Sequence, residues 1–263
     1  RGLNLGSGKI TKKETRGIPH YLLDVASPRR RFSAAHFKKM AQAAIKKIRC
    51  QNKLPIICGG TGFYIRALID DLPIPAVKPN LKLRAKLEKK TIEELFKELK
   101  KADPRRAKAI DPRNPRRLIR ALEIIYTTGK VVPPLNISRL KSDFNDYKPL
   151  FLGLQLPRPK LARRIKIRLQ KRLKQGMLAE VKKLHQQGLS WKRLDDFGLE
   201  YRWLAKYLQK RISYSEMFTR LQKDIEHFAK RQMIWFKRDP RIIWIKNRSE
   251  AQKKIRAFLE KRG

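Results

Sequence analysis

The residues best placed for phosphate chemistry are Gly59, Gly60 and Thr61, which follow an apolar run, Leu54–Cys58, and precede a segment expected to be helical from about Gly62. A glycine turn between a strand and a helix lets backbone N–H groups and the positive end of the helix dipole meet a phosphate. The Thr61 hydroxyl could add a hydrogen bond to a phosphate or to a metal-bound water. Gly-Gly turns after strands are common, so the pattern alone leaves an ordinary connection open.

A second candidate site for an anion is the stretch from Gly198 to Arg202. Gly198 is expected to enter a helix whose first turn carries Tyr201 and Arg202. A cation at the N-terminus of a helix opposes the helix dipole, so Arg202 is expected to have an anionic neighbour. Either Glu200 or a bound pyrophosphate would serve.

Two basic segments have the composition of RNA-binding surfaces. In the first, Asn114 can cap a helix, Pro115 suits its first turn, and Arg116 and Arg120 lie four residues apart on one face, which fits phosphate contacts. The second, residues 228–238, interleaves aromatic and cationic side chains, which suits stacking on unpaired bases and contact with phosphates. Spacing alone does not exclude a solvated basic face for the first segment or an amphipathic helix end for the second.

The stretch Gly6-Ser7-Gly8-Lys9 resembles the end of a phosphate-binding P-loop but is not predicted to be one. The first glycine of the P-loop pattern would fall at Leu3, the residue after Lys9 is Ile10, and no strand precedes the stretch.

The elements that would position these residues form an alternating pattern. Four short apolar runs are continuous rather than alternating, which is typical of strands covered on both faces. They are Tyr21–Val25, Leu54–Cys58, Leu150–Leu154 and Ile242–Ile245. Helical patterns separate them, namely Ser33–Arg49, Lys160–Gln175 and a long one from Ser213 to about Lys237. The fold class predicted is α/β with a parallel sheet.

Residues 77–145 are predicted to form a helical insertion in an α/β core made of residues 1–76 and 146–263. Prolines gather at both ends of this stretch, at 73, 75 and 79 and again at 133 and 134, and no strand-like run lies between them. The alternative is a series of ordinary crossover helices.

The overall charge favours a polyanionic partner. The chain has 66 Lys and Arg against 23 Asp and Glu, a net charge of +43, and such a surface speeds and strengthens encounters with nucleic acids. A merely solubilising surface is the alternative.

Two cysteines, Cys50 and Cys58, make no disulfide framework or metal-ligand pattern. No apolar run approaches the roughly 20 residues of a membrane helix, and no signal peptide is visible, so a cytoplasmic protein is predicted.

Taken together and in this order, the segments resemble the tRNA dimethylallyltransferase family over almost the entire chain. The segments that carry the resemblance are residues 1–6 (Arg-Gly-Leu-Asn-Leu-Gly), 17–24 (Gly-Ile-Pro-His-Tyr-Leu-Leu-Asp), 32–34, 59–64 (Gly-Gly-Thr-Gly-Phe-Tyr), 111–120 and 229–232 (Ala-Lys-Arg-Gln).

The resemblance implies a P-loop-NTPase-like parallel sheet core with an inserted helical domain. It implies transfer of a dimethylallyl group from dimethylallyl diphosphate to N6 of the adenosine 3′-adjacent to the anticodon. The target base must leave its stack to be reached, and the site must gather cations and donors around the departing diphosphate. The expected partners are the tRNA anticodon stem-loop and dimethylallyl diphosphate, with Mg²⁺ bound through the diphosphate, no protein ligand to a metal, no membrane and no obligate protein partner.

The resemblance also assigns roles to residues. Gly59, Gly60, Thr61 and Arg202 are expected to bind diphosphate, with Thr61 and Arg202 at the reacting centre. The residues expected to contact tRNA are Lys82, Arg116, Arg117, Leu118, Ile119, Arg120, Gly198, Tyr201, Lys230, Arg231, Gln232, Trp235 and Lys237.

Two departures from the family pattern stand out. The family's glycine-rich phosphate loop and the aspartate expected as general base lie upstream of what matches Arg1. The sequence, which starts without Met, is therefore interpreted as truncated and as a poor catalyst by itself. Glu200 replaces the glycine usual beside the tyrosine. The alternatives are a non-catalytic tRNA-binding paralogue and an adenylate isopentenyltransferase, although a free nucleotide requires no long basic insertion.

Overall fold

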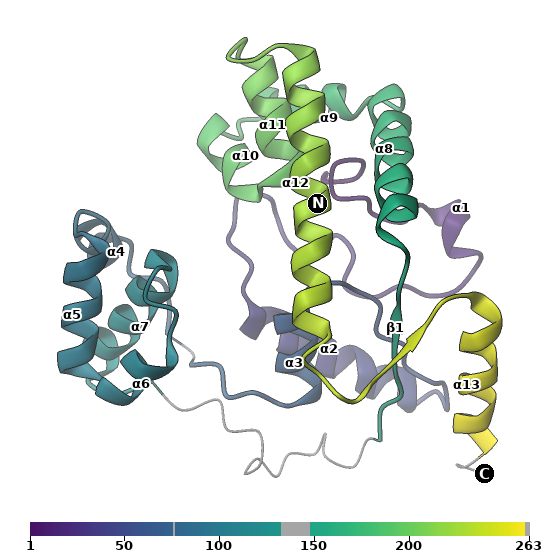
Figure 1. Ribbon diagram of the computed structural model, residues 1–263, viewed down its shortest axis with the longest axis horizontal. Coiled ribbons are helices and arrows are strands. Elements are labelled where there is room, and N and C mark those ends of the chain that lie inside the picture. Colours follow the sequence, from purple (N-terminus) through teal and green to yellow (C-terminus); the bar gives the residue numbers. More distant parts are fainter. Residues whose placement is uncertain (76, 133–147, 261–263) are drawn as a thin grey trace. The chain divides into compact units, whose positions relative to one another are not determined.

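The computed structural model describes residues 1–75, 77–132 and 148–260. The chain divides into two compact units (Figure 1). The first contains Arg1–Ile65 and Tyr147–Gly263, and the second contains Arg66–Asp146. The second unit starts earlier than the insertion predicted from the sequence, at 66 rather than 77. Its role as a tRNA-binding insertion stays a prediction.

The first unit holds a parallel pair of strands, as predicted. Strand β1 (Phe151–Leu154) pairs with β2 (Ile242–Ile245), with Phe151 opposite Ile242 and Leu154 opposite Ile245. Gly153 lies under the ring of Trp244, because a Cβ built on it would be 2.8 Å from that ring. The continuous apolar runs therefore identified these two strands correctly.

The other two predicted strands are wrong. Within Tyr21–Val25 the backbone of Leu22 and Asp24 is left-handed, with φ of 63° and 54°, which is incompatible with a strand. Leu54–Cys58 is extended but unpaired, and Leu54 and Ile56 are 51% and 78% exposed. An apolar run becomes a strand only when a neighbour supplies a ladder, and no described strand lies against this one.

A bundle of helices forms most of the first unit. Its helices are α1 (Lys12–Thr15), α2 (Ala34–Arg49), α8 (Arg158–Lys174), α9 (Met177–Gln186), α10 (Trp191–Phe197), α11 (Leu199–Leu208), α12 (Tyr214–Phe236) and α13 (Arg248–Glu260). The start of α3 (Gly62–Ile69) belongs to it as well. Ser33 and Ser213 cap α2 and α12, since their side chains accept the His36 and Glu216 N–H groups.

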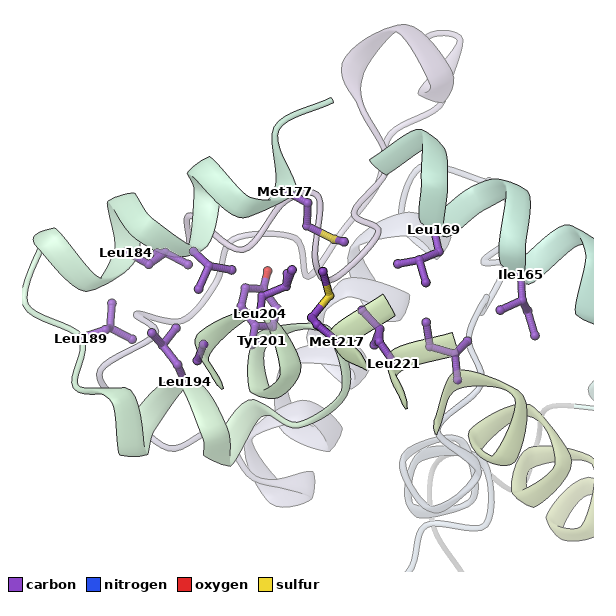
Figure 2. Close-up of a cluster of buried hydrophobic side chains, with 13 residues drawn as sticks. Ile165, Leu169, Met177, Leu184, Leu189, Leu194, Tyr201, Leu204, Met217 and Leu221 are labelled. Atoms are coloured by element: carbon purple, nitrogen blue, oxygen red, sulfur yellow. The ribbon is translucent and has the colours of Figure 1, made fainter. Parts of the chain in front are cut away.

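The main core of this unit lies between α8, α9, α11 and α12. Figure 2 shows its side chains, including Leu169 of α8, Met177 of α9, Leu204 of α11 and Leu221 of α12. Their spacing along each helix follows one face, so burial of that face stabilises the bundle.

The second unit has a core of its own. Helices α4 (Leu81–Leu87), α5 (Ile92–Ala102), α6 (Pro104–Ala109) and α7 (Pro115–Thr128) enclose Leu95, Leu99, Leu118 and Leu122. The described residues of this unit contain no strand, in agreement with its sequence. The end of the predicted insertion, from residue 133, lies outside the described residues.

Candidate functional site

The glycine turn at residues 59–62 lies directly against the C-terminal half of α12. Gln232 Nε2 donates a hydrogen bond to the Gly60 carbonyl oxygen at 3.0 Å. A Cβ on Gly60 would overlap the Gln232 side chain, and a Cβ on Gly62 would overlap the Trp235 indole. Glycine is therefore needed at position 62, where the rigid indole ring approaches closely, whereas a side chain at position 60 would displace the flexible Gln232 amide. The fold brings together two segments that are about 170 residues apart and that the sequence assigned to different ligands.

The outer side of the turn is open. Gly59 and Thr61 are exposed, and a Cβ on Gly59 would meet nothing within 4 Å. The Thr61 carbonyl accepts the Tyr64 and Ile65 N–H groups at 2.9 and 3.2 Å, which places Thr61 at the start of α3. Within the described parts of the chain its hydroxyl has no hydrogen-bond partner. The turn therefore presents a hydroxyl and a helix N-terminus to solvent, a combination suited to an anion.

The basic segment at the end of α12 has two faces. Gln232 and Trp235 are half-buried and face the turn, as the contacts above require. Lys230, Arg231 and Lys237 are exposed. The first two residues therefore support the turn, while the three cations remain available to a ligand.

Arg202 has an anionic neighbour, but the neighbour is Asp195. Arg202 Nε lies 3.2 Å from Asp195 Oδ1, and Gly198, which starts α11, has a left-handed φ of 74°. Glu200, one of the neighbours expected for Arg202, pairs instead with Arg172 at 3.5 Å. Burial raises the pKa of Glu200 and lowers that of Arg172. That part of the expectation is wrong, because the helix turns the Glu200 side chain into the protein.

Tyr201 is buried rather than available to RNA. It is 4% exposed, and its hydroxyl donates to Glu180 Oε1 at 2.9 Å. Burial, together with the neighbouring Glu180 carboxylate, raises the pKa of Tyr201, so the hydroxyl keeps its proton and remains a donor. The expected contact of Tyr201 with tRNA stays a prediction, and it would require this side chain to leave Glu180.

Glu180, which the sequence analysis did not identify, joins the N-terminal segment to α11 through hydrogen bonds. Its Oε2 accepts the N–H groups of Asn4 and Leu5 at 3.0 and 2.7 Å, and its Oε1 accepts that of Gly6 at 3.1 Å. With the Tyr201 hydroxyl, one carboxylate takes four hydrogen bonds. The amides that lead into the stretch resembling a P-loop thus bind an internal carboxylate. Glu180 is the only acidic residue of α9, which is a weak signal in the sequence.

Comparison with known proteins identifies the family. Residues 1–239 match the family model described as IPP transferase. The chain belongs to this family.

Several IPP transferases are close relatives. The chain is 39% identical over 249 residues to the tRNA dimethylallyltransferase of Pelotomaculum thermopropionicum, covering 94% of this chain and 79% of the relative. It is 41% identical to tRNA dimethylallyltransferase 1 of Trichlorobacter lovleyi, covering 93% and 81%.

Solved IPP transferase structures confirm the fold class. The tRNA isopentenylpyrophosphate transferase of Bacillus halodurans superposes with a TM-score of 0.69 at 30% identity, covering 99% of this chain and 83% of that one. A eukaryotic dimethylallyltransferase acting on tRNA gives 0.69 at 25% identity, covering 88% and 59%. The α/β core predicted from the sequence is thus the IPP transferase core.

In the second unit, the residues expected to bind RNA fall into two groups. Lys82, Arg116 and Arg117 are exposed. Leu118 and Ile119 are 0% and 8% exposed and pack in the core, so their expected contact with tRNA stays a prediction that only their backbone could fulfil in this conformation. The helical periodicity of α7 that directs Arg116 and Arg117 to solvent also directs Leu118 and Ile119 into the core.

Arg120 belongs to a buried ion-pair network. Its Nη1 lies 2.6 Å from Glu123 Oε2, and its Nη2 donates to the Val77 carbonyl at 3.0 Å. Arg84 reaches the same fully buried carboxylate at 2.7 Å. Burial raises the pKa of Glu123, but hydrogen bonds from the two arginines outweigh it and leave this pKa below its ordinary value. Arg120 therefore stabilises the unit, whatever else it contacts.

Among the described residues, no three His, Cys, Asp or Glu side chains form a group that could hold a metal ion. None of the described helices is long and apolar enough to cross a membrane.

Proposed function

We propose that this IPP transferase transfers a dimethylallyl group from dimethylallyl diphosphate to N6 of the adenosine 3′-adjacent to the anticodon of tRNA. The observation that carries the proposal is the Gly59–Gly62 turn held by Gln232 and Trp235, since it joins a phosphate-binding element to a helix end with exposed cations.

The reaction exchanges one bond for another. N6 attacks the allylic carbon, a C–N bond forms, the C–O bond to diphosphate breaks and diphosphate leaves with the electron pair. The proton on the cationic N6 then passes to water. Charge grows on the leaving oxygens, so donors aimed at them lower the barrier. The Gly59 and Thr61 side of the turn supplies such donors, and Arg202 is the cation we assign to the same group, released from Asp195 when diphosphate binds.

Mg²⁺ would neutralise charge on the leaving diphosphate. The described residues offer no carboxylate cluster, so the donor set fits an ion held by diphosphate oxygens. In that arrangement the free hydroxyl of Thr61 contacts a metal-bound water.

We assign the anticodon stem-loop of tRNA as the RNA partner. The exposed cations that we assign to its phosphates are Lys82, Arg116, Arg117, Lys230, Arg231 and Lys237. The backbone at Gly198 completes the set. The net charge of +43 favours this partner over a free nucleotide, which offers few phosphates. The protein would act in the cytoplasm without an obligate protein partner.

The test is binding of an anticodon stem-loop over a range of salt concentrations, with a control RNA whose target adenosine is replaced by guanosine. Tight, salt-dependent binding that prefers the adenosine supports the proposal. Equal binding of both RNAs would mean that charge alone makes the contact, and would remove the claim about the target base. The protein should then transfer label from dimethylallyl diphosphate to the adenosine RNA only.

A further inference from the structure

Helix α8 carries a row of cations that the proposed site does not use. The helix has nine Lys and Arg and no Asp or Glu in its 17 residues. Ile165 and Leu169 face the core. Lys160, Arg163, Lys171 and Lys174 lie on the opposite face and are exposed. We call these four residues the outer row.

The outer row is straight. Its members and the exposed Ile167 between them follow a 3, 4, 4, 3 spacing, which keeps successive side chains on one line along a helix. From Lys160 to Lys174 the row is about 21 Å long at about 1.5 Å per residue. A line of cations of this length matches several consecutive phosphates of one strand rather than a single small anion.

Among the residues that the structure describes, no acid forms an ion pair with Lys160, Arg163 or Lys174, and the one carboxylate near the outer row is that of Glu14, whose charge interacts with Lys171. Arg172, on another side of α8, takes the buried Glu200. Glu14 of α1, which lies beside α8, has its carboxylate held by the Thr11 N–H at 2.9 Å and hydroxyl at 2.8 Å. Like charges three and four residues apart on a helix repel each other and destabilise it. A bound polyanion would relieve this repulsion.

The outer row lies in the same unit as the candidate site, on a helix that packs beside α12. Leu161, next to Lys160, and Ala229, next to Lys230, pack on the same buried cluster. Helix α8 then runs beside α12 (Figure 1). The outer row therefore runs along a helix that packs on α12, on the face of α8 turned away from the shared core.

We infer that the outer row binds the sugar-phosphate backbone of the tRNA outside its anticodon loop. The inference rests on the proposed function and adds a second contact to it. With the target adenosine in the site, the stem that follows would lie along α8. The row would then raise affinity for whole tRNA without touching the reacting base.

The test replaces the row by glutamine, which keeps the helix propensity of the segment. The variant is Lys160→Gln, Arg163→Gln, Lys171→Gln and Lys174→Gln together. A matched control removes the same charge from α13, with Arg248→Gln, Lys253→Gln, Lys254→Gln and Arg256→Gln, all exposed residues. Each protein is titrated with whole tRNA and with a single-stranded oligomer of the anticodon-loop sequence alone.

For whole tRNA, the slope of log affinity against log salt should become less steep by about 3 to 4, because each phosphate that a cation neutralises adds about 0.9 to the slope. Binding of the loop oligomer and prenyl transfer at saturating tRNA should match the wild type. A slope change no larger than that of the α13 control, or an equal loss for the oligomer, overturns the inference. Failure of the wild type to prefer the adenosine stem-loop would instead count against the proposed function.

Discussion

Replacement of Glu180 by glutamine should release the first residues of the chain from the helical bundle. The carboxylate accepts four hydrogen bonds, from the amides of Asn4, Leu5 and Gly6 and from the Tyr201 hydroxyl, over distances of 2.7 to 3.1 Å. Glutamine has the same shape, but its NH₂ group would face donors in place of one oxygen. At least one of the two pairs of bonds is lost, and the other pair is left to a neutral acceptor.

The expected cost follows from these bonds. Hydrogen bonds to a charged group contribute about 1.5–3 kcal/mol each, so the loss of two predicts that unfolding of the first unit becomes easier by about 3 kcal/mol. Tyr201→Phe removes one of these bonds and should cost about 1.5 kcal/mol. Because the units have separate cores, the measurement is urea denaturation read together with hydrogen exchange at individual amides.

The matched control is Glu216→Gln, which removes an exposed carboxylate paired with Arg220 and should change stability by less than about 1 kcal/mol. In the Glu180 variant, the amides of residues 4–6 should exchange much faster, while those of α12 keep their protection at low urea. Unchanged exchange at residues 4–6, or a loss no larger than the control, would refute the view that this carboxylate holds the segment.

Four further outcomes are expected. Thr61→Ala should lower prenyl-transfer turnover on the order of a hundredfold while tRNA affinity, measured separately, stays near wild type; the reverse pattern would remove the hydroxyl from the diphosphate site. Arg117→Ala should weaken tRNA binding and reduce its salt slope by about 1, and an unchanged slope excludes this contact. Gly62→Ala should destabilise the packing of the turn on α12, seen as a lower melting temperature, whereas Gly59→Ala, with open space around its Cβ, should keep the wild-type melting temperature and lose diphosphate affinity. The pKa of Glu123 is lowered in the folded state, so the stability that this carboxylate contributes is complete above its unfolded pKa of about 4.3 and is lost as the pH falls below that value. Circular dichroism should show this acid sensitivity in the wild type. The Glu123→Gln variant should be less stable at neutral pH and should not show the acid sensitivity.

Local signals in the sequence predicted local structure well. Ser33, Asn114 and Ser213 each cap a helix, because a short polar side chain before an amphipathic pattern has few better uses. The strands at Phe151–Leu154 and Ile242–Ile245 were predicted correctly because each finds a hydrogen-bonding partner in the other.

Features that depend on distant partners were missed. The run Leu54–Cys58 has a strand's composition but no described neighbour to pair with. Glu180 looks like one acid on a surface helix, and its role comes from amides more than 170 residues away. At the candidate site, the turn and the basic helix end were both predicted, but nothing in either segment indicates that they touch. The ion pairs that Arg120 makes with Glu123 could not be predicted, because a motif gives residue types without their direction from the helix axis.

The contact between Gln232 and Gly60 has a thermodynamic consequence for the order of substrate binding. The same last turns of α12 support the proposed diphosphate turn on one side and offer Lys230, Arg231 and Lys237 to RNA on the other. Any shift of that helix end on binding one substrate changes the turn that receives the second. Linkage then requires each substrate to alter the affinity for the other by the same factor, whichever arrives first. Because both substrates contact the same helix end, the binding of one is expected to change the affinity for the other before the chemical step begins.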